Sequence, residues 1–162
     1  MNAITQYFGE EKRESIYFIC IGFIAFSISL FYLLFRKDPH LNGIAYAIVS
    51  IGLIQLVVGI TVYLKSDLDT VRVMHYVEKE IKSIEDYEIP RMLVVIKHLV
   101  IYRWVEIALI IIGFLLVFIF EPKSLGNGLG IGLVIQTTIM FVLDYNAEKR
   151  GKAYLDYLKS LL

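Results

Sequence analysis

The strongest chemical signal in the sequence is an acidic residue at the edge of a hydrophobic segment. Glu106 directly precedes an uncharged stretch, Ile107 to Phe120. An ionisable side chain at membrane depth is costly, so it is a functional candidate by default. Helical spacing places Glu106 on the same face as Gly113, which predicts that it points toward other helices. Arg103 lies three residues earlier and is the expected ion-pair partner; the simpler alternative is a purely structural pair at the inner membrane interface.

A second acid, Asp144, ends the last apolar segment of the chain at about the same predicted depth. Glu106 and Asp144 together are candidates for an acidic ring in an oligomeric cation pathway. The alternative is that both are interfacial charges whose side chains extend to water.

Two glutamines, Gln55 and Gln136, each lie near the middle of an apolar segment. Such a side chain can bind a ligand or ion at the membrane midplane, or it can hydrogen-bond across a close helix contact. Packing is the favoured interpretation, and a bond between the two amides, within one chain or between subunits, is a further alternative. Gln55 is expected on the same helix face as small residues spaced for close packing. The predicted helix-packing residues are Ala45, Gly52, Gly59, Gly113 and Gly132.

Motifs for catalysis or metal binding are not recognisable in the sequence. The three histidines, His40, His75 and His98, lie in separate regions without metal-ligand spacing, and Cys20 is the only cysteine. We therefore expect no enzyme activity, no metal and no cofactor. The formal net charge of zero gives no reason to expect a nucleic-acid partner.

The elements that position these residues are four apolar segments. Hydrophobic residues make up 57% of the chain, and a helix of about 20 apolar residues spans a bilayer. We predict an all-α polytopic membrane protein with one membrane domain, 1–162, built as two helical hairpins. The predicted transmembrane helices are 16–35, 44–64, 102–120 and 128–143, with a connector at 65–101 and a tail at 144–162.

The connector is predicted to contain an amphipathic helix of about five turns that Pro90 ends or kinks. Residues 92–101 are expected to extend the third transmembrane helix into the cytoplasm. The apolar stripe suits the membrane interface, a second copy of the chain or a cytoplasmic partner that docks at 65–101. Its apolar positions are Val71, Met74, Val77, Ile81 and Ile84.

Basic residues are distributed unequally between the two sides of this predicted topology. Thirteen of the sixteen lysines and arginines precede the first segment, lie between Lys65 and Arg103, or follow the last segment. The two hairpin loops hold the other three, Arg36, Lys37 and Lys123. The positive-inside rule therefore predicts a cell (inner) membrane protein with both termini in the cytoplasm.

Three functions are compatible with this architecture. The favoured one is a non-enzymatic protein that binds another membrane protein or itself within the lipid bilayer, as an immunity- or defence-type accessory protein would. The first alternative is a homo-oligomeric ion channel, because four short helices seldom enclose a pore alone. The second is a small-solute transporter, for which a weak similarity between the two hairpins is the motivation.

Overall fold

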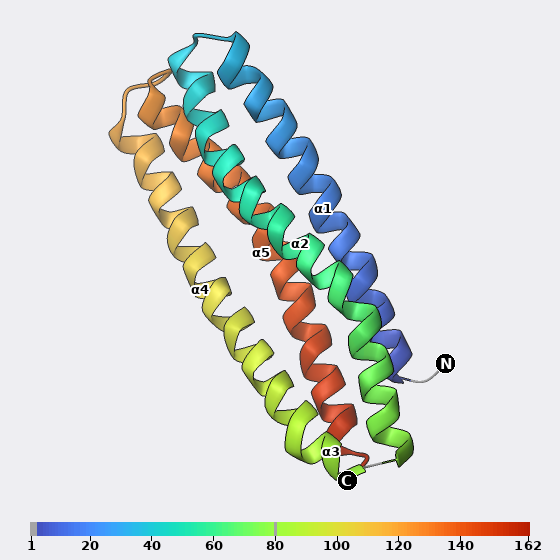
Figure 1. Ribbon diagram of the computed structural model, residues 1–162. Coiled ribbons are helices and arrows are strands. Elements are labelled where there is room, and N and C mark those ends of the chain that lie inside the picture. The colour runs from blue at the N-terminus through green and yellow to red at the C-terminus, as the bar shows by residue number, and fades with distance from the viewer. Residues whose placement is uncertain (1–2, 80) are drawn as a thin grey trace.

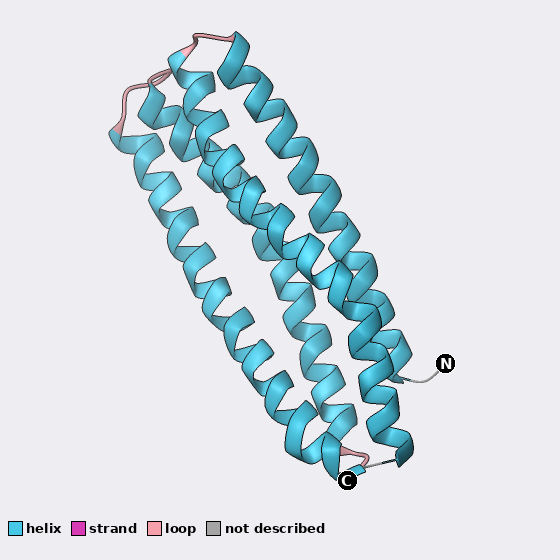
Figure 2. Cartoon of the chain, in the orientation of Figure 1, coloured by secondary structure: helices cyan, strands magenta, loops and turns pink. Residues whose placement is uncertain are grey.

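The computed structural model describes residues 3–79 and 81–162, which form four long helices without a strand (Figures 1 and 2). All four are long and apolar enough to cross a membrane, so the prediction of an all-α, multi-pass membrane protein is confirmed. Two short elements, α3 and η1, join the hairpins. The elements are α1 Ala3–Phe35, α2 Pro39–Lys79, α3 Ile81–Ser83, the π-helical η1 Ile84–Glu88, α4 Ile89–Ile119 and α5 Leu125–Lys159.

Local capping explains where α2 and α5 begin. The Leu41 backbone N–H donates to Asp38 Oδ1 over 3.0 Å, and Pro39 occupies the start of α2, where its missing N–H is harmless. Ser124 caps α5 by accepting a hydrogen bond of 3.2 Å from the Asn127 N–H. Gly43, expected in the first loop, consequently lies inside α2.

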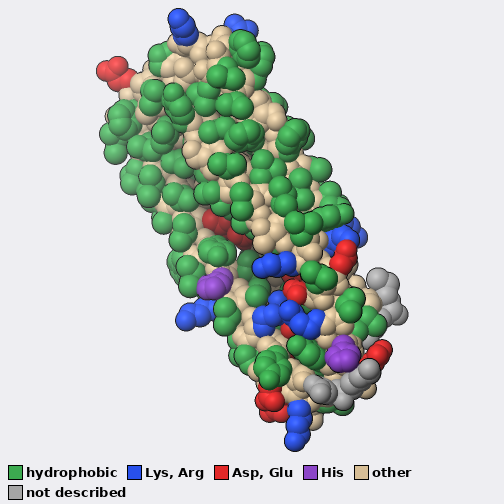
Figure 3. Space-filling view, in the orientation of Figure 1, with side chains coloured by type: hydrophobic (Ala, Val, Ile, Leu, Met, Phe, Trp, Pro, Cys, Tyr) green, Lys and Arg blue, Asp and Glu red, His purple; other side chains and the backbone are tan. Residues whose placement is uncertain are grey.

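The helices are longer than a bilayer is thick. The 41 residues of α2 extend for about 60 Å, twice the hydrocarbon core of about 30 Å. The surplus lies at the end of the bundle that holds both termini and α3 (Figure 1). Figure 3 shows that charged and histidine side chains gather toward this end, whereas hydrophobic side chains cover most of the remaining visible surface. We call this polar part the terminal end of the bundle.

The connector differs from its prediction as a separate amphipathic helix. Its first part is an unbroken continuation of α2 to Lys79, and Pro90 begins α4 instead of ending a helix. Val71 is exposed, whereas Ile84 is fully buried in the terminal end. The helical period alone could not distinguish a membrane-surface helix from two helices that pack on the rest of the same chain. The predicted extension of the third transmembrane helix before residue 102 is confirmed.

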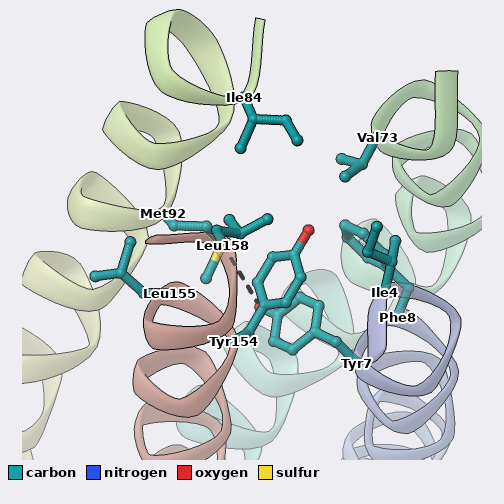
Figure 4. Close-up of a cluster of buried hydrophobic side chains, with 9 residues drawn as sticks. All are labelled: Ile4, Tyr7, Phe8, Val73, Ile84, Met92, Tyr154, Leu155 and Leu158. Carbon is teal, nitrogen blue, oxygen red and sulfur yellow. Dashed lines mark hydrogen bonds between the residues drawn. The ribbon is translucent and has the colours of Figure 1, made fainter. Parts of the chain in front are cut away.

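A hydrophobic core holds the terminal end together (Figure 4). The rings of Tyr7 and Tyr154 stack with centroids 4.0 Å apart, and the Tyr7 hydroxyl contacts Met92 Sδ at 3.8 Å. Burial raises the pKa of both tyrosine hydroxyls, which therefore stay neutral. Leu155 and Leu158 of the predicted tail belong to this core. The tail is thus the last part of α5.

A buried acidic residue, Glu88, lies at the edge of this core near the turn between α2 and α4. Glu88 is 1% exposed and accepts hydrogen bonds from Arg91 Nε at 2.9 Å and Nη2 at 2.6 Å. The Tyr154 hydroxyl donates to the same carboxylate over 3.4 Å. Arg72 lies 3.8 Å from it. The network ties α2, α4 and α5 together at this end.

Within the membrane, small residues set the distances between helices, as predicted. All five predicted packing residues are buried. Gly52 and Gly59 face α1, Gly113 faces α5 and Gly132 faces α2. The helices pack in the order α1, α2, α5 and α4, so α4 packs along α5 and not along α2. This open arrangement leaves space between α2 and α4.

Candidate functional site

A cavity of about 320 Å³ lies between α2 and α4, with α5 behind it. Its rim consists of apolar side chains that are also exposed on the outer surface: Ile54 and Val58 of α2, and Tyr102 and Val105 of α4. The visible face in Figure 3 has acidic side chains in a recess surrounded by hydrophobic ones. Because these helices cross the membrane, the cavity opens sideways toward lipid. We call it the membrane cavity.

The floor of the membrane cavity carries both predicted acids. Glu106 of α4 is 4% exposed and Asp144 of α5 is 8% exposed, and their carboxyl groups lie beside each other. Within the described part of the chain, neither Glu106 oxygen accepts a hydrogen bond from an N–H or an alcohol. Thr137 Oγ1 also lines the cavity and is buried without a hydrogen-bond partner there. Buried polar atoms normally have hydrogen-bond partners, so a group from outside the chain can bind to these atoms.

The expected pair between Arg103 and Glu106 is wrong. Arg103 Nη1 instead binds Glu148 Oε2 of α5 at 2.9 Å, and Lys152 Nζ binds the other Glu148 oxygen at 2.5 Å. Glu148 lies one turn beyond Asp144, so the two long helices present an ion pair nearer the terminal end and two acids deeper in the bundle. The long arginine side chain reaches toward the more polar level, which costs less than turning inward. The acids are left without a cation from the described residues.

The two predicted glutamines meet inside one chain. Gln136 Nε2 donates to Gln55 Oε1 over 2.7 Å, and both side chains are buried. The expectation that Gln55 shares the face of Gly52 and Gly59 is not met, because those glycines contact α1 while Gln55 contacts α5. Three residues along a helix turn the side chain by about 300°, which places Gln55 on the neighbouring face. The pair joins the two hairpins at their centre.

Replacing Gln55 with leucine is expected to destabilise the bundle by about 1 kcal/mol, because Gln136 loses its partner in a dry environment. The double variant Gln55→Leu and Gln136→Leu should recover most of that loss. Unfolding in mixed micelles with increasing sodium dodecyl sulfate measures both. A double variant less stable than either single variant would contradict a pairing role for the two amides.

Thr137 is the site residue that the sequence analysis did not single out. It precedes Asp144 by seven residues, two helical turns, which puts both on one face of α5. The spacing therefore predicts that Thr137 and Asp144 are neighbours. A threonine in a membrane helix usually hydrogen-bonds to the backbone of its own helix, so its presence alone does not indicate a site. Met140 lies between them and also lines the cavity.

The site can bind a positive charge. Two adjacent carboxyl groups attract a cation, the apolar walls exclude water from the lipid side, and Thr137 offers a further oxygen. No family model, curated protein or solved structure matches the chain. The geometry of this cavity is therefore the basis for a function. Among the described residues, no three His, Cys, Asp or Glu side chains are close enough to hold a metal ion.

Proposed function

We propose that this protein is a non-enzymatic interaction protein that binds another membrane protein inside the bilayer. The partner's transmembrane helix would lie along the opening between α2 and α4 and place a lysine or arginine in the membrane cavity. The observation that carries the proposal is the pair Glu106 and Asp144, buried side by side on the floor of a cavity that opens to lipid. An immunity- or defence-type accessory protein would act in this way.

Charge complementarity supports this partner. Buried carboxylates without a cation are costly, and so is a lone basic residue in a partner's membrane helix. Association of the two helices pairs the basic residue with the carboxylates and so lowers the cost of burying both. A second copy of this chain does not suit the site, because Arg103 is the one basic residue in the four predicted transmembrane segments and it is bound to Glu148. The partner is therefore a different protein.

The two alternatives receive unequal support. A pore lined by an acidic ring needs Glu106 and Asp144 on the outer surface of the subunit, and here they face the interior of one chain. A small organic cation is the second candidate, as a transporter would require. The volume of about 320 Å³ is within the usual range for ligand pockets, and its walls are mostly apolar.

The orientation of the chain in the membrane is part of the proposal. Thirteen of the sixteen basic residues precede residue 16, lie between Lys65 and Arg103, or follow residue 143, which favours the cytoplasm for both termini and the α2–α4 turn. The protein would then belong to the cell membrane, with the acid pair nearer the cytoplasmic side. The exposed surface around Leu68, Val71 and Tyr87 at the terminal end is available to a cytoplasmic partner.

A designed peptide tests the proposal without knowledge of the natural partner. The probe is a fluorescent helix of leucine and alanine, about 20 residues long, with one lysine at the depth of Glu106. In nanodiscs that hold the labelled protein, energy transfer should report binding about tenfold tighter than for a matched peptide with leucine in place of lysine. The double variant Glu106→Gln and Asp144→Asn should bind both peptides equally.

Two outcomes would reject a helical partner. Equal affinity of the wild-type protein for the lysine and leucine peptides would show that the acids do not select a basic helix. Binding of tetraphenylphosphonium, lost in the double variant, without selective binding of the lysine peptide would favour the small organic cation. The variant Glu85→Gln, exposed at the terminal end, is the control for a general effect of charge.

A further inference from the structure

Two more cavities follow the membrane cavity in the direction of the terminal end of the bundle. The middle cavity, of about 130 Å³, shares Phe18, Val58, Leu99 and Asp144 with the membrane cavity. The end cavity, of about 180 Å³, lies between α1 and α5 and shares Tyr7 and Arg150 with the middle cavity. The three adjoining spaces form a series from the acid pair to the polar surface of the terminal end.

Each of the three cavities has polar groups in its lining. Gln6 and Glu10 border the end cavity, and Glu11, Glu14 and Arg150 border the middle one. Arg150 forms an ion pair with Glu14, but its Nε is buried without a hydrogen-bond partner in the described residues. A buried donor beside a cavity of this size is usually satisfied by water.

The membrane cavity also contains buried polar atoms that water or a ligand could hydrogen-bond. Among the described residues, the buried Glu106 oxygens have only the Asp144 carboxyl group beside them, and the buried Thr137 Oγ1 has no hydrogen-bond partner. A volume of about 320 Å³ holds several water molecules, since one needs about 10–15 Å³ of such space. Unsatisfied groups therefore occur at both ends of the middle cavity.

On the side of the membrane cavity away from the terminal end, α2 and α5 pack tightly against each other. The bond between Gln55 and Gln136 joins α2 to α5 there, and beyond it Gly132 packs against Ile44 and Ala47 of α2. A further cavity of about 210 Å³ lies between α1 and α2 near the first hairpin loop. It shares no lining residue with the membrane cavity.

We propose that the three cavities form a one-sided water path, through which protons from the side of the terminal end reach Glu106 and Asp144. The charge of the acid pair then follows the pH on that side of the membrane and is insulated from the other. This inference goes beyond the proposed partner and does not depend on it, because water access is a property of the protein alone.

Cysteine accessibility tests the path in vesicles that contain the full chain with Cys20→Ala. Met140→Cys places a thiol in the membrane cavity, and Val142→Cys places one on the lipid-facing side of α5, where Val142 is 53% exposed. Val142 is also closer to the terminal end, so depth alone would favour its reaction. Lys82→Cys, exposed beside the turn, identifies which side the reagent reaches.

Silver ions and a membrane-impermeant trimethylammonium methanethiosulfonate are the two reagents. From the side that modifies Lys82→Cys, silver should modify Met140→Cys about tenfold faster than Val142→Cys, because reaction needs a hydrated, ionisable thiol. From the other side, Met140→Cys should stay protected. Adding Ala147→Leu, which fills the middle cavity, should slow Met140→Cys, whereas the exposed neighbour change Asn146→Leu should not. The methanethiosulfonate reagent is larger than a silver ion, so comparing the rates of the two reagents at Met140→Cys measures the width of the path.

Each contrary outcome overturns part of the inference. Equal slow modification of both thiols would show a dry cavity and reject the path. Equal modification of Met140→Cys from both sides would reject its one-sidedness. Fast modification that Ala147→Leu leaves unchanged would reject the route through the middle cavity. None of these results depends on the binding of a basic peptide, so they are separate from a failure of the proposed function.

Discussion

Changing Gly128 to alanine should destabilise the protein by about 3 kcal/mol, because the added methyl group would overlap the His40 carbonyl oxygen. The clash is with a backbone atom, so no side-chain rotation relieves it. A methyl group added to Gly43 on the facing helix would equally overlap the Leu125 carbonyl oxygen, so the backbones of α2 and α5 lie close together at both glycines. Small residues four apart, Gly128 and Gly132, permit this contact in a membrane.

The same substitution elsewhere in the chain is the matched control. A methyl group on Gly9 of α1 meets no atom within 4 Å, so Gly9→Ala should stabilise the helix by about 0.5–1 kcal/mol. Unfolding in sodium dodecyl sulfate mixed micelles measures both variants. Equal stability of Gly128→Ala and the wild-type protein would contradict the close contact of these helices.

Removing the Glu88 carboxylate is the second change with a large expected effect. Glu88→Ala should destabilise the terminal end by about 2–4 kcal/mol, since truncating one partner of a buried ion pair leaves the other uncompensated. Arg91 is 30% exposed and can partly recover its hydration, so we expect a loss at the lower end of this range. The Tyr154 hydroxyl loses its acceptor in the same step.

Hydrogen–deuterium exchange separates this local effect from global unfolding. Backbone amides of residues 84–92 and 66–76 should exchange faster in Glu88→Ala, while those of the membrane segments keep their protection. Glu85→Ala, on the exposed side of the same turn, should change stability by less than about 0.5 kcal/mol. Similar exchange in the two variants would show that the buried carboxylate does not hold this end together.

Some site features could be read from the chain because they depend on neighbours along one helix. Glu106 was expected to face inward from its register with Gly113, and both are buried. The small residues were expected at helix contacts, and Gly52, Gly59, Gly113 and Gly132 are each at one. Gln55 and Gln136 were recognised as a possible pair from their similar depth. Periodicity along a single helix is sufficient for inferences of this kind.

The class of the protein, four apolar helices in two hairpins, follows from the sequence alone, since the hydrophobicity of about 20 consecutive residues is a local property. Which helices touch depends on how they pack in three dimensions. Arg103 pairs with Glu148, the connector divides between α2 and α4, and the acids share a cavity because α4 packs on α5 and not on α2. Contacts between helices depend on axial offset and crossing angle, and several combinations of these bury the same residues. The pattern along the chain therefore cannot select among them.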